Sequence, residues 1–314
     1  MLGRTANGVF WMSRYLERAE NSARLIDAGF RMALTRDTAM SEEEWRSLVI
    51  TTGQRRDYEA RHTTYTGTQV FNWILRDRNN PASVLAMVET ARTNARMVRA
   101  GLTREVWEAI NESWLRLNER LARPVRESSL GDVLDTIRRS STQVRGAIAG
   151  TMLRNEIYNF SRIGKFIERA DNTARILDVK YYVLLPSVSY VGSSLDNVQW
   201  DNVLRSVSAE RAYRWLNAGR MDARSIAEFL ILDGRFPRSL AFCYSKIRSN
   251  LDSLAQEYGC ETPCHEMLRC ADGSLHQGGI DHIFDSGLHE FIGEFITANQ
   301  ALAMQVQTDY RFIE

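Results

Sequence analysis

The chain has 314 residues, 44% of them hydrophobic and 25% charged, which is the balance of a soluble globular protein able to bury a full core. Its formal net charge of +1 argues against general electrostatic binding to nucleic acid or acidic lipid, because both need a concentrated positive surface. No apolar run reaches the roughly 18 residues of a membrane span, and the first residues contain no signal-peptide core. We therefore expect a cytoplasmic protein without a membrane segment.

Apolar residues recur at three- and four-residue spacing almost throughout the chain, which predicts an all-α fold. The first helix has an apolar face from Val9 to Phe30, and the second begins at Ser41, which starts a capping box that ends at Glu44. Further helices are predicted at Gln69–Asp77, from Pro81 to Gly101, at Trp107–Leu121, Ser129–Met152 and Asn155–Leu185, and near 197–206, 209–217, 222–232, 237–257 and 285–312. The one β-rich patch, Tyr181–Val191, is short and contains Pro186, which ends the preceding helix.

A thirteen-residue motif occurs twice. Residues 16–28 read LERAENSARLIDA and residues 167–179 read IERADNTARILDV, an offset of 151. The repeat continues at offsets of 155 and 156, with Trp45 and Trp200, Tyr58 and Tyr213, the helix breaks Asp77–Ser83 and Asp233–Ser239, and Arg92–Asn94 and Arg248–Asn250. We therefore predict a helical bundle of two homologous repeats, about 1–150 and 151–314, packed about a pseudo-twofold axis as a single unit over 1–314. The two motif helices should lie side by side and roughly antiparallel.

The polar residues of each motif form one stripe beside the apolar face on a helical wheel of about 100° per residue. The first stripe comprises Glu17, Glu20, Asn21, Arg24 and Asp27, and the second comprises Glu168, Asp171, Asn172, Arg175 and Asp178. Arg18 and Arg169 fall on the far side of their helices, so the adjacent Glu and Arg of each motif point apart. Each stripe holds three carboxylates and one arginine, a formal charge of −2.

The stripes allow two interpretations. The structural one is a ladder of ion pairs, because Glu20 and Arg24 are four residues apart in the favourable order and Asp27 follows Arg24 by three. The functional one is that the surplus negative charge binds a cation, either Mg²⁺ or a substrate ammonium group. A ferritin-like di-iron site is disfavoured, since it needs a Glu-x-x-His pattern and neither stripe contains His. We favour the ladder.

Other candidate chemistry is weaker. Cys260, Cys264, His265 and Cys270 are residue types that bind zinc, but their spacing is not the compact C-x2-C pair of a zinc ribbon. We expect reduced thiols in an irregular surface loop over Cys260–Cys270, with zinc as the alternative. His289 and Glu290, on an otherwise apolar last helix, are secondary site candidates. No serine-hydrolase, P-loop or dinucleotide-binding motif occurs, and no cofactor is evident.

Four segments of the chain resemble the bacterial alpha-E proteins, a family named for a helical domain with a Glu-Arg motif. These segments are NGVFWMSRYLERAEN at 7–21, ERADNTARILDVKY at 168–181, EFLILD with FPRSL at 228–240, and GLHEF at 287–291. The resemblance covers almost the whole chain. It departs at about Gly259–Ile280, where we associate no cysteine pattern with the family.

This resemblance implies a pathway more than an activity. Members of the family are encoded beside a circularly permuted ATP-grasp protein, sometimes fused to it, and often with a transglutaminase-like peptidase. ATP-grasp enzymes make amide bonds through acyl phosphates, so the resemblance implies a helical, non-catalytic partner in a peptide- or amide-forming pathway, with ATP used only by the partner. The alternative is an enzyme that acts on the ligase's activated product through the stripe carboxylates, Arg24 and Arg175. A stand-alone metal- or ligand-binding protein is a weaker alternative, and the sequence leaves a homo-oligomer open.

Overall fold

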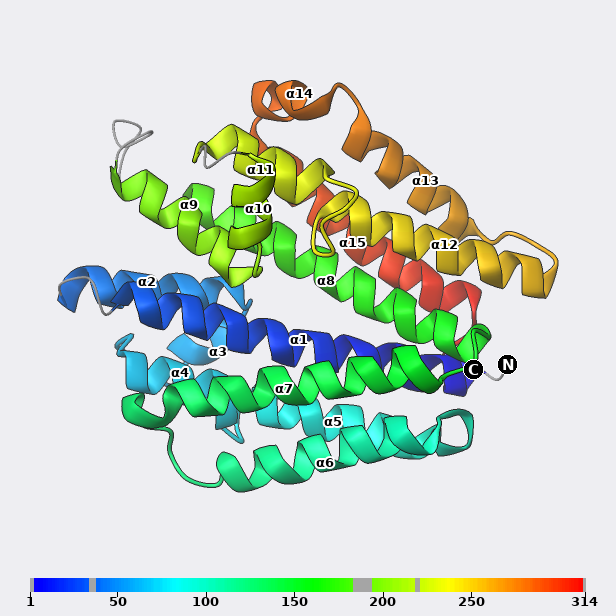
Figure 1. The fold of residues 1–314 in the computed structure, drawn as a ribbon, viewed down its shortest axis with the longest axis horizontal. Helices are drawn as coiled ribbons and strands as arrows, with labels where there is room; N and C mark the ends of the chain where they lie inside the picture. The colour runs from blue at the N-terminus through cyan, green and yellow to red at the C-terminus, as the bar shows by residue number, and fades with distance from the viewer. Residues whose placement is uncertain (1–2, 34–37, 183–193, 218–220, 313–314) are drawn as a thin grey trace. The chain divides into compact units, whose positions relative to one another are not determined.

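All regular structure in the computed structural model, which describes residues 3–33, 38–182, 194–217 and 221–312, is helical (Figure 1). The α-helices are α1 (Gly3–Ala33), α2 (Thr38–Thr51), α3 (Arg55–Glu59), α4 (Gly67–Arg76), α5 (Val84–Met97), α6 (Arg104–Arg120), α7 (Glu127–Thr151), α8 (Glu156–Tyr182), α9 (Ser194–Ser206), α10 (Glu210–Leu216), α11 (Ala223–Leu232), α12 (Leu240–Tyr258), α13 (Pro263–His276), α14 (Gly279–Ser286) and α15 (Leu288–Asp309). The all-α prediction is confirmed for this part of the chain. Of the helices described, none combines the length and hydropathy that a membrane crossing requires.

The chain divides into two compact units, and α8 runs from one into the other. The first unit comprises the described residues of 1–168 and 310–314, and the second comprises those of 169–309. The C-terminal segment belongs to the first unit because Phe312 packs against Phe10 and Phe160, with ring centroids 5.4 and 5.8 Å apart.

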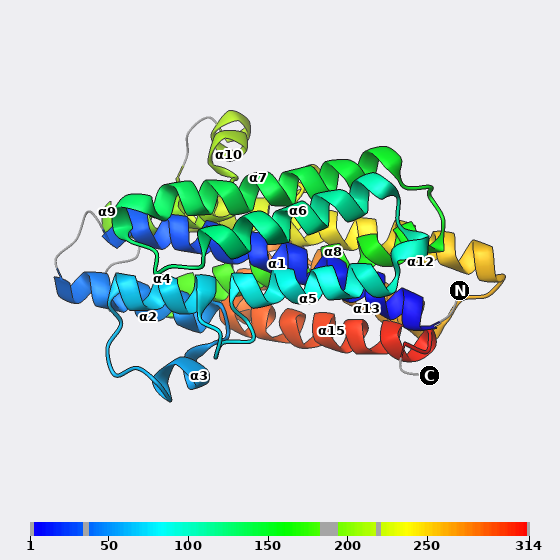
Figure 2. The ribbon, with the colours of Figure 1, turned by 90° about the horizontal axis from the view of Figure 1, so that it is seen from below.

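In the first unit, α1 is the central helix. It packs against α2, α4, α5 and α7, and α6 covers α5 and α7. Figure 2 shows α4 and α5 end to end along one side of α1, with α6 and α7 side by side. The apolar face predicted for α1 is buried, from Val9 to Ile26. Because α1 has neighbours on several sides, its polar residues must find partners inside the unit.

In the second unit, α11 packs against α9, α12, α13 and α14. α13 also packs against α12 and α15, while α14 packs against α15. The largest fully buried side chains here are Tyr213 of α10 and Tyr244 of α12. Burial raises the pKa of Tyr244 far above its ordinary value, as expected for a phenol that stays protonated in a core.

The repeated helix break has the same local structure in both units. Asp77 ends α4 and Asp233 ends α11, and each carboxylate accepts a hydrogen bond from the backbone N–H two residues on, at 2.8 and 2.7 Å. Ser83 and Ser239 then cap α5 and α12, since each side chain accepts from the N–H three residues on, at 3.4 and 3.0 Å. The two halves of the sequence therefore share the turn chemistry that separates their helices.

Several predicted boundaries are corrected. The helical backbone of α2 already begins at Thr38, so Ser41 lies inside the helix and cannot be its cap. α5 begins at Val84 and not at Pro81, because Ser83 is the capping residue. Residues 183–191 of the β-rich patch, with Pro186, lie outside the described residues.

The irregular loop predicted over Cys260–Cys270 is also wrong. Pro263 occupies the first turn of α13, directly after Thr262, where a proline costs no hydrogen bond. Leu268 and Leu275 are buried on one face of this helix. The short segment is amphipathic, and that pattern outweighs its single internal glycine.

α1 and the first half of α8, up to Glu168, lie side by side in the first unit. Ser13 of α1 hydrogen-bonds Ser161 of α8 at 2.8 Å. Close by, Gly164 approaches the backbone of Phe10 so tightly that a Cβ on residue 164 would overlap the Phe10 carbonyl oxygen. α1 and the first half of α8 start on the same side of Figure 1 and run in the same general direction, so the antiparallel orientation that we predicted is wrong. The reason is α7, which packs along α1 and returns the chain to the start of α1 before α8 begins.

Candidate functional site

The first polar stripe is largely buried in the first unit. Glu17, Glu20 and Asn21 are 3%, 0% and 2% exposed. They project from the middle of α1, where the neighbouring helices exclude water. A carboxylate buried to this extent is stable in its charged form only when cations or hydrogen-bond donors surround it.

Glu20 meets two arginines. Arg24, one turn further along α1, donates from Nε at 3.0 Å and from Nη2 at 2.6 Å to Oε1. Arg145 of α7 forms an ion pair with the other carboxylate oxygen. The Glu20–Arg24 pair confirms one step of the predicted ladder, and Arg145 extends that ladder to a second helix.

Asp27, near the end of the same stripe, also binds arginines. Arg138 of α7 donates to its Oδ2 at 2.9 Å, and Arg31 of α1 donates to its Oδ1 at 3.3 Å. All three side chains are partly exposed, so these two ion pairs contribute less to stability than the buried pair at Glu20.

The second stripe is divided between the two units. Glu168 lies in the first unit and is discussed below with its arginines. In the second unit, Arg175 donates from Nε to Asp171 at 2.7 Å, one helical turn away. Asp178 accepts from His289 Nδ1 of α15 at 2.5 Å, while Asn172 is half-buried on α8. The structure thus brings the secondary candidate His289 to the stripe.

Glu168 binds two arginines of α1. Arg18 donates from Nε at 2.5 Å and from Nη2 at 2.8 Å, and Arg14 donates from Nε at 3.0 Å. The helical wheel places Arg18 on the far side of α1 from Glu17, and there Arg18 reaches α8. Arg18 pairs with the glutamate of the other motif. The corresponding Arg169 is buried and donates to the Pro237 carbonyl at 3.2 Å.

The pKa of Glu168 reflects this pairing. Burial by itself would raise the pKa of this carboxyl group, but the charges and hydrogen bonds of Arg18 and Arg14 hold it below its ordinary value. Glu168 is therefore ionised at neutral pH and is poorly suited to accept a proton as a general base.

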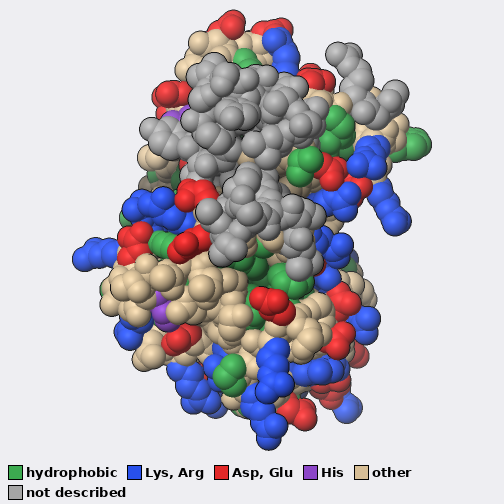
Figure 3. All heavy atoms as spheres, turned by 90° about the vertical axis from the view of Figure 1, so that its left-hand side faces the viewer, with side chains coloured by type: hydrophobic (Ala, Val, Ile, Leu, Met, Phe, Trp, Pro, Cys, Tyr) green, Lys and Arg blue, Asp and Glu red, His purple; other side chains and the backbone are tan. Residues whose placement is uncertain are grey.

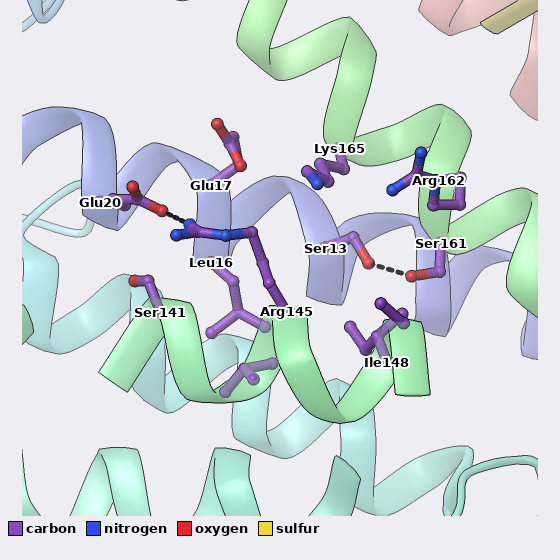
Figure 4. A pocket seen from close by; sticks show the side chains of 12 residues that line it. Ser13, Leu16, Glu17, Glu20, Ser141, Arg145, Ile148, Ser161, Arg162 and Lys165 are labelled. Atoms are coloured by element: carbon purple, nitrogen blue, oxygen red, sulfur yellow. Dashed lines mark hydrogen bonds and ion pairs between the residues drawn. The ribbon is translucent and has the colours of Figure 1, made fainter. Parts of the chain in front are cut away.

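A small pocket opens beside Glu17 and Glu20 in the first unit (Figure 4). Its lining comes from α1, α7 and α8, and its free volume of about 40 Å³ has room for a few water molecules or one small polar group. Leu16, Val144 and Ile148 contribute apolar walls. The polar lining residues are Ser13, Glu17, Glu20, Ser141, Arg145, Ser161, Arg162 and Lys165.

Cationic side chains from outside the first stripe lie close to its carboxylates. Each stripe alone has surplus negative charge, which motivated the cation-binding interpretation. The structure adds arginines and a lysine from outside the first stripe. Charged side chains gather where α1 and α8 cross, once Glu168 and its partners are included. The negative ones are Glu17, Glu20 and Glu168, and the positive ones are Arg14, Arg18, Arg24, Arg145, Arg162 and Lys165. We call this set the crossing cluster, and it is positive overall.

A larger pocket of about 380 Å³ lies in the second unit between α13, α14 and α15. Glu290, the other secondary candidate, lines it together with His282 and Glu294. His289 is not among its lining residues, so the two adjacent candidates face different surroundings.

The cysteine segment holds no converging set of metal ligands. Among the residues that the structure describes, no group of three or more His, Cys, Asp or Glu side chains is arranged to bind a metal ion. Cys260 and Cys270 are exposed, whereas Cys264 is buried and burial raises the pKa of its thiol to about 12. His265 uses both ring nitrogens, since Nδ1 accepts from the Thr262 N–H at 3.0 Å and Nε2 lies 3.0 Å from the Leu251 carbonyl.

Sequence reasoning missed the basic half of this site. A signal was present for Arg14 and Arg18, which are four residues apart and therefore share a helical face on which they form a basic pair. No such signal marked Arg145 or Lys165, because only the packing of α7 and α8 on α1 brings them to the stripe.

Comparison with known proteins places the chain in a family. The sequence profile of the Alpha-E family, described as a predicted alpha-helical domain with a conserved ER motif, matches residues 1–310. The chain therefore belongs to the Alpha-E family. The repeated thirteen-residue motif of this chain contains two Glu-Arg pairs, Glu17–Arg18 and Glu168–Arg169.

Relatives occur in mycobacteria. An uncharacterised protein of Mycobacterium bovis and one of Mycobacterium tuberculosis are each 23% identical over 278 residues, which is 83% of this chain. The chain spans only about a third of their length, 31%. No solved structure matches the chain.

Proposed function

We propose that the chain is a helical accessory protein of a circularly permuted ATP-grasp amide ligase, and that it presents or receives the substrate in a peptide- or amide-forming pathway. The observation that carries this proposal is the pairing of stripe carboxylates with arginine. Glu20, Glu168 and Asp171 are each bound by at least one guanidinium group, as in a structural ladder. A general base must take up a proton near its working pH. The pKa of Glu168 is lowered, so this carboxylate takes up a proton less readily than an ordinary glutamate.

Membership of the Alpha-E family and the greater length of the mycobacterial relatives support a unit that works beside other polypeptide segments. Figure 3 shows basic and acidic side chains interspersed on one face of the described part of the chain, which suits a protein partner better than nucleic acid. In this proposal ATP is bound by the ligase alone, and a transglutaminase-like peptidase is a further partner. The pseudo-twofold arrangement of the two repeats and a cytoplasmic location belong to the same proposal, and the shared helix-break chemistry supports the repeats.

The proposal is tested with the ATP-grasp protein encoded beside this chain. The tagged chain should retain the ligase through purification. The ligase is then incubated with ATP and cell extract, with and without the chain, and products are compared by mass spectrometry. We expect a product that needs both proteins and ATP. Equal product formation without the chain, together with no co-purification, would contradict the proposal.

The alternative is an enzyme in its own right, and the pocket beside Glu17 favours it, because a carboxylate there lies among cationic side chains. The two functions differ in the order of events. An accessory protein acts only while the ligase is present, whereas an enzyme converts the ligase's released product after the ligase is removed. The weaker alternative, Mg²⁺ or zinc binding, is tested by the metal content of the purified protein.

A further inference from the structure

A groove of about 460 Å³ lies between α1 and α5 in the first unit, and it shares no lining residue with the pocket beside Glu17. Its lining residues recur at three- and four-residue spacing on each helix, so each helix presents one face to the groove. The residues that matter below are Arg4, Asn7, Trp11 and Tyr15 of α1, and Asn94 and Met97 of α5. We call this space the α1–α5 groove.

Gly8 allows the two helices to approach closely at one point of this groove. A Cβ on residue 8 would overlap the Val98 side chain, and the Asn94 carbonyl oxygen would lie 3.7 Å from that Cβ. α1 and α5 run in opposite directions (Figure 2), so the groove follows α1 from Arg4 to Tyr15 and α5 in the reverse sense. These eleven residues of helix rise about 16 Å, which is enough for roughly four residues of an extended peptide.

Trp11 and Tyr15 form a rigid aromatic wall. Their ring centroids are 5.5 Å apart and their planes are tilted by 34°. Arg14 of the crossing cluster lies 4.7 Å from the centre of the Trp11 ring and is itself bound to Glu168 at 3.0 Å, which holds the ring in place. On α5, Met97 is 69% exposed, and its flexible thioether adapts to apolar groups of different shape. The groove is therefore suited to an apolar side chain.

The polar lining matches the backbone of a peptide. Asn7 and Asn94 each carry a carboxamide, which donates to a carbonyl group and accepts from an N–H group. Neither of these side chains is hydrogen-bonded to another residue in the described part of the chain. A neighbouring peptide offers both kinds of partner in every residue.

Arg4 gives one end of the groove a positive charge. It is the one charged side chain among the described residues that line the groove, and it forms no ion pair within the described ranges. A guanidinium group binds the two oxygens of a carboxylate. The end of the groove at the start of α1 is therefore complementary to a carboxylate.

We propose that the α1–α5 groove binds the C-terminal segment of a peptide. Arg4 binds the terminal carboxylate, Asn7 and Asn94 bind the backbone, and an apolar side chain packs on the aromatic wall. That this peptide is the substrate of the pathway rests on the proposed function, because an ATP-grasp ligase activates a carboxylate. Binding to the groove does not rest on it, so binding is measured with the chain alone.

Two methionines form a matched pair for the binding experiment. Met97 and Met304 are 69% and 68% exposed, but of these two only Met97 lines the groove. The full chain is labelled with ¹³C in its methionine methyl groups for NMR, and Met97→Leu and Met304→Leu assign the two signals. The probes are the tetrapeptide acetyl-Ala-Leu-Phe-Ala with a free C-terminal carboxylate and the same tetrapeptide with a C-terminal amide.

We expect the carboxylate peptide to shift the Met97 signal with a Kd below about 1 mM and to leave the Met304 signal unchanged. The amide peptide should bind about tenfold more weakly, because it offers Arg4 no negative charge. Acetate and the neutral sugar maltotriose should shift neither signal. The proposal would be overturned by no shift of Met97 at about 10 mM peptide, tenfold above the Kd of a weak site. Equal shifts of both methionines, equal affinity for the two peptides, or tighter binding of maltotriose would overturn it as well.

Arg4→Gln tests where the carboxylate binds, and Arg96→Gln is its matched control. Both arginines are exposed, but Arg96 of α5 does not line the groove. Arg4→Gln should weaken binding of the carboxylate peptide about tenfold and leave binding of the amide peptide unchanged, whereas Arg96→Gln should keep the preference for the carboxylate. Asn94→Leu should weaken binding of both peptides alike. A preference for the carboxylate that survives Arg4→Gln would contradict the assignment. Groove binding without any ligase-dependent product would support this inference and contradict the proposed function.

Discussion

Glu168 joins the two motif helices through Arg14 and Arg18. Its side chain is 4% exposed and that of Arg14 is 11% exposed, so Glu168→Gln leaves buried positive charge without compensation. Breaking a buried pair costs about 3–5 kcal/mol, and we expect the lower end, because Arg18 is 38% exposed. Urea unfolding at pH 7 measures the change in free energy of unfolding.

The matched control is Glu59→Gln. Glu59 also binds an arginine, Arg55, at 2.9 Å, but both side chains lie at the surface. This variant should unfold at the same urea concentration as the wild type. If Glu59→Gln and Glu168→Gln shift the midpoint equally, the importance of the buried pair is refuted.

The pH dependence of stability should reveal the same carboxylate. Because the folded state lowers the pKa of Glu168, the stabilisation is complete above the pKa of the unfolded chain and is lost as the pH falls through the folded-state pKa. The difference in unfolding free energy between the wild type and Glu168→Gln should be largest at neutral pH and should shrink below about pH 4. Urea melts at pH 7, 4 and 3 measure this difference, and a gap that grows on acidification would reverse the assignment.

At the scale of the elements, the crossing of α1 and α8 depends on Gly164. A Cβ at this position would overlap the Phe10 carbonyl oxygen, a backbone atom that cannot rotate away. Gly164→Ala should therefore destabilise the protein by about 1–3 kcal/mol, although alanine is the better helix former. Gly146→Ala is the control, since nothing lies within 4 Å of its new methyl group and the same change in α7 should be neutral or stabilising. Thermal melts should show a lower midpoint for Gly164→Ala and an unchanged or higher midpoint for Gly146→Ala.

α13 offers a test that separates a structural histidine from a metal ligand. His265 links Thr262 at the start of this helix to the Leu251 carbonyl of α12. His265→Ala should lower the unfolding free energy by about 1–3 kcal/mol, because buried backbone groups lose their partner. The purified wild type should contain no stoichiometric zinc by elemental analysis. Zinc at one equivalent, lost in Cys264→Ser, would reverse this interpretation.

Much of the element structure can be predicted from sequence, and the failures have local causes. The 3.6-residue periodicity placed the start of α8 within one residue, and the repeated pair Tyr58 and Tyr213 is fully buried in both copies. The short α3, α13 and α14 were missed, because Gly or Pro residues beside or within these segments favour the prediction of a loop.

The site was only half predictable, for a different reason. Each of the pairs Glu20–Arg24 and Asp171–Arg175 lies within a single helix, four residues apart, so a helical wheel predicts it. Arg18 and Arg145 reach carboxylates on other helices. Those contacts depend on how the helices cross, and a single helical wheel carries no information about crossing.

At the scale of the whole molecule, the same motif position is buried differently in the two units. Glu20 is fully buried between Arg24 and Arg145, whereas the side chain of Asp171 is 12% exposed and that of its partner Arg175 is 33% exposed. We expect Glu20→Gln to cost about 3–5 kcal/mol and Asp171→Asn clearly less, because an exposed partner keeps some hydration. Equal costs would mean that the two stripes are energetically equivalent.

The double variant Glu20→Gln with Asp171→Asn separates the two interpretations of the stripes. If the stripes are structural ladders, neutralising both carboxylates leaves partly buried guanidinium groups without their counter-charges, so the protein melts earlier by at least the cost of the Glu20 change. Pathway product, formed with the ATP-grasp partner, should then fall in proportion to the folded protein. If the stripes are catalytic, the product disappears while the fold persists, because functional sites commonly sacrifice stability. Melting curves measured beside product formation per folded molecule decide the question. We expect a destabilised variant whose folded fraction forms product normally. A variant of normal stability that forms no product would contradict the interpretation of the stripes as structural ladders.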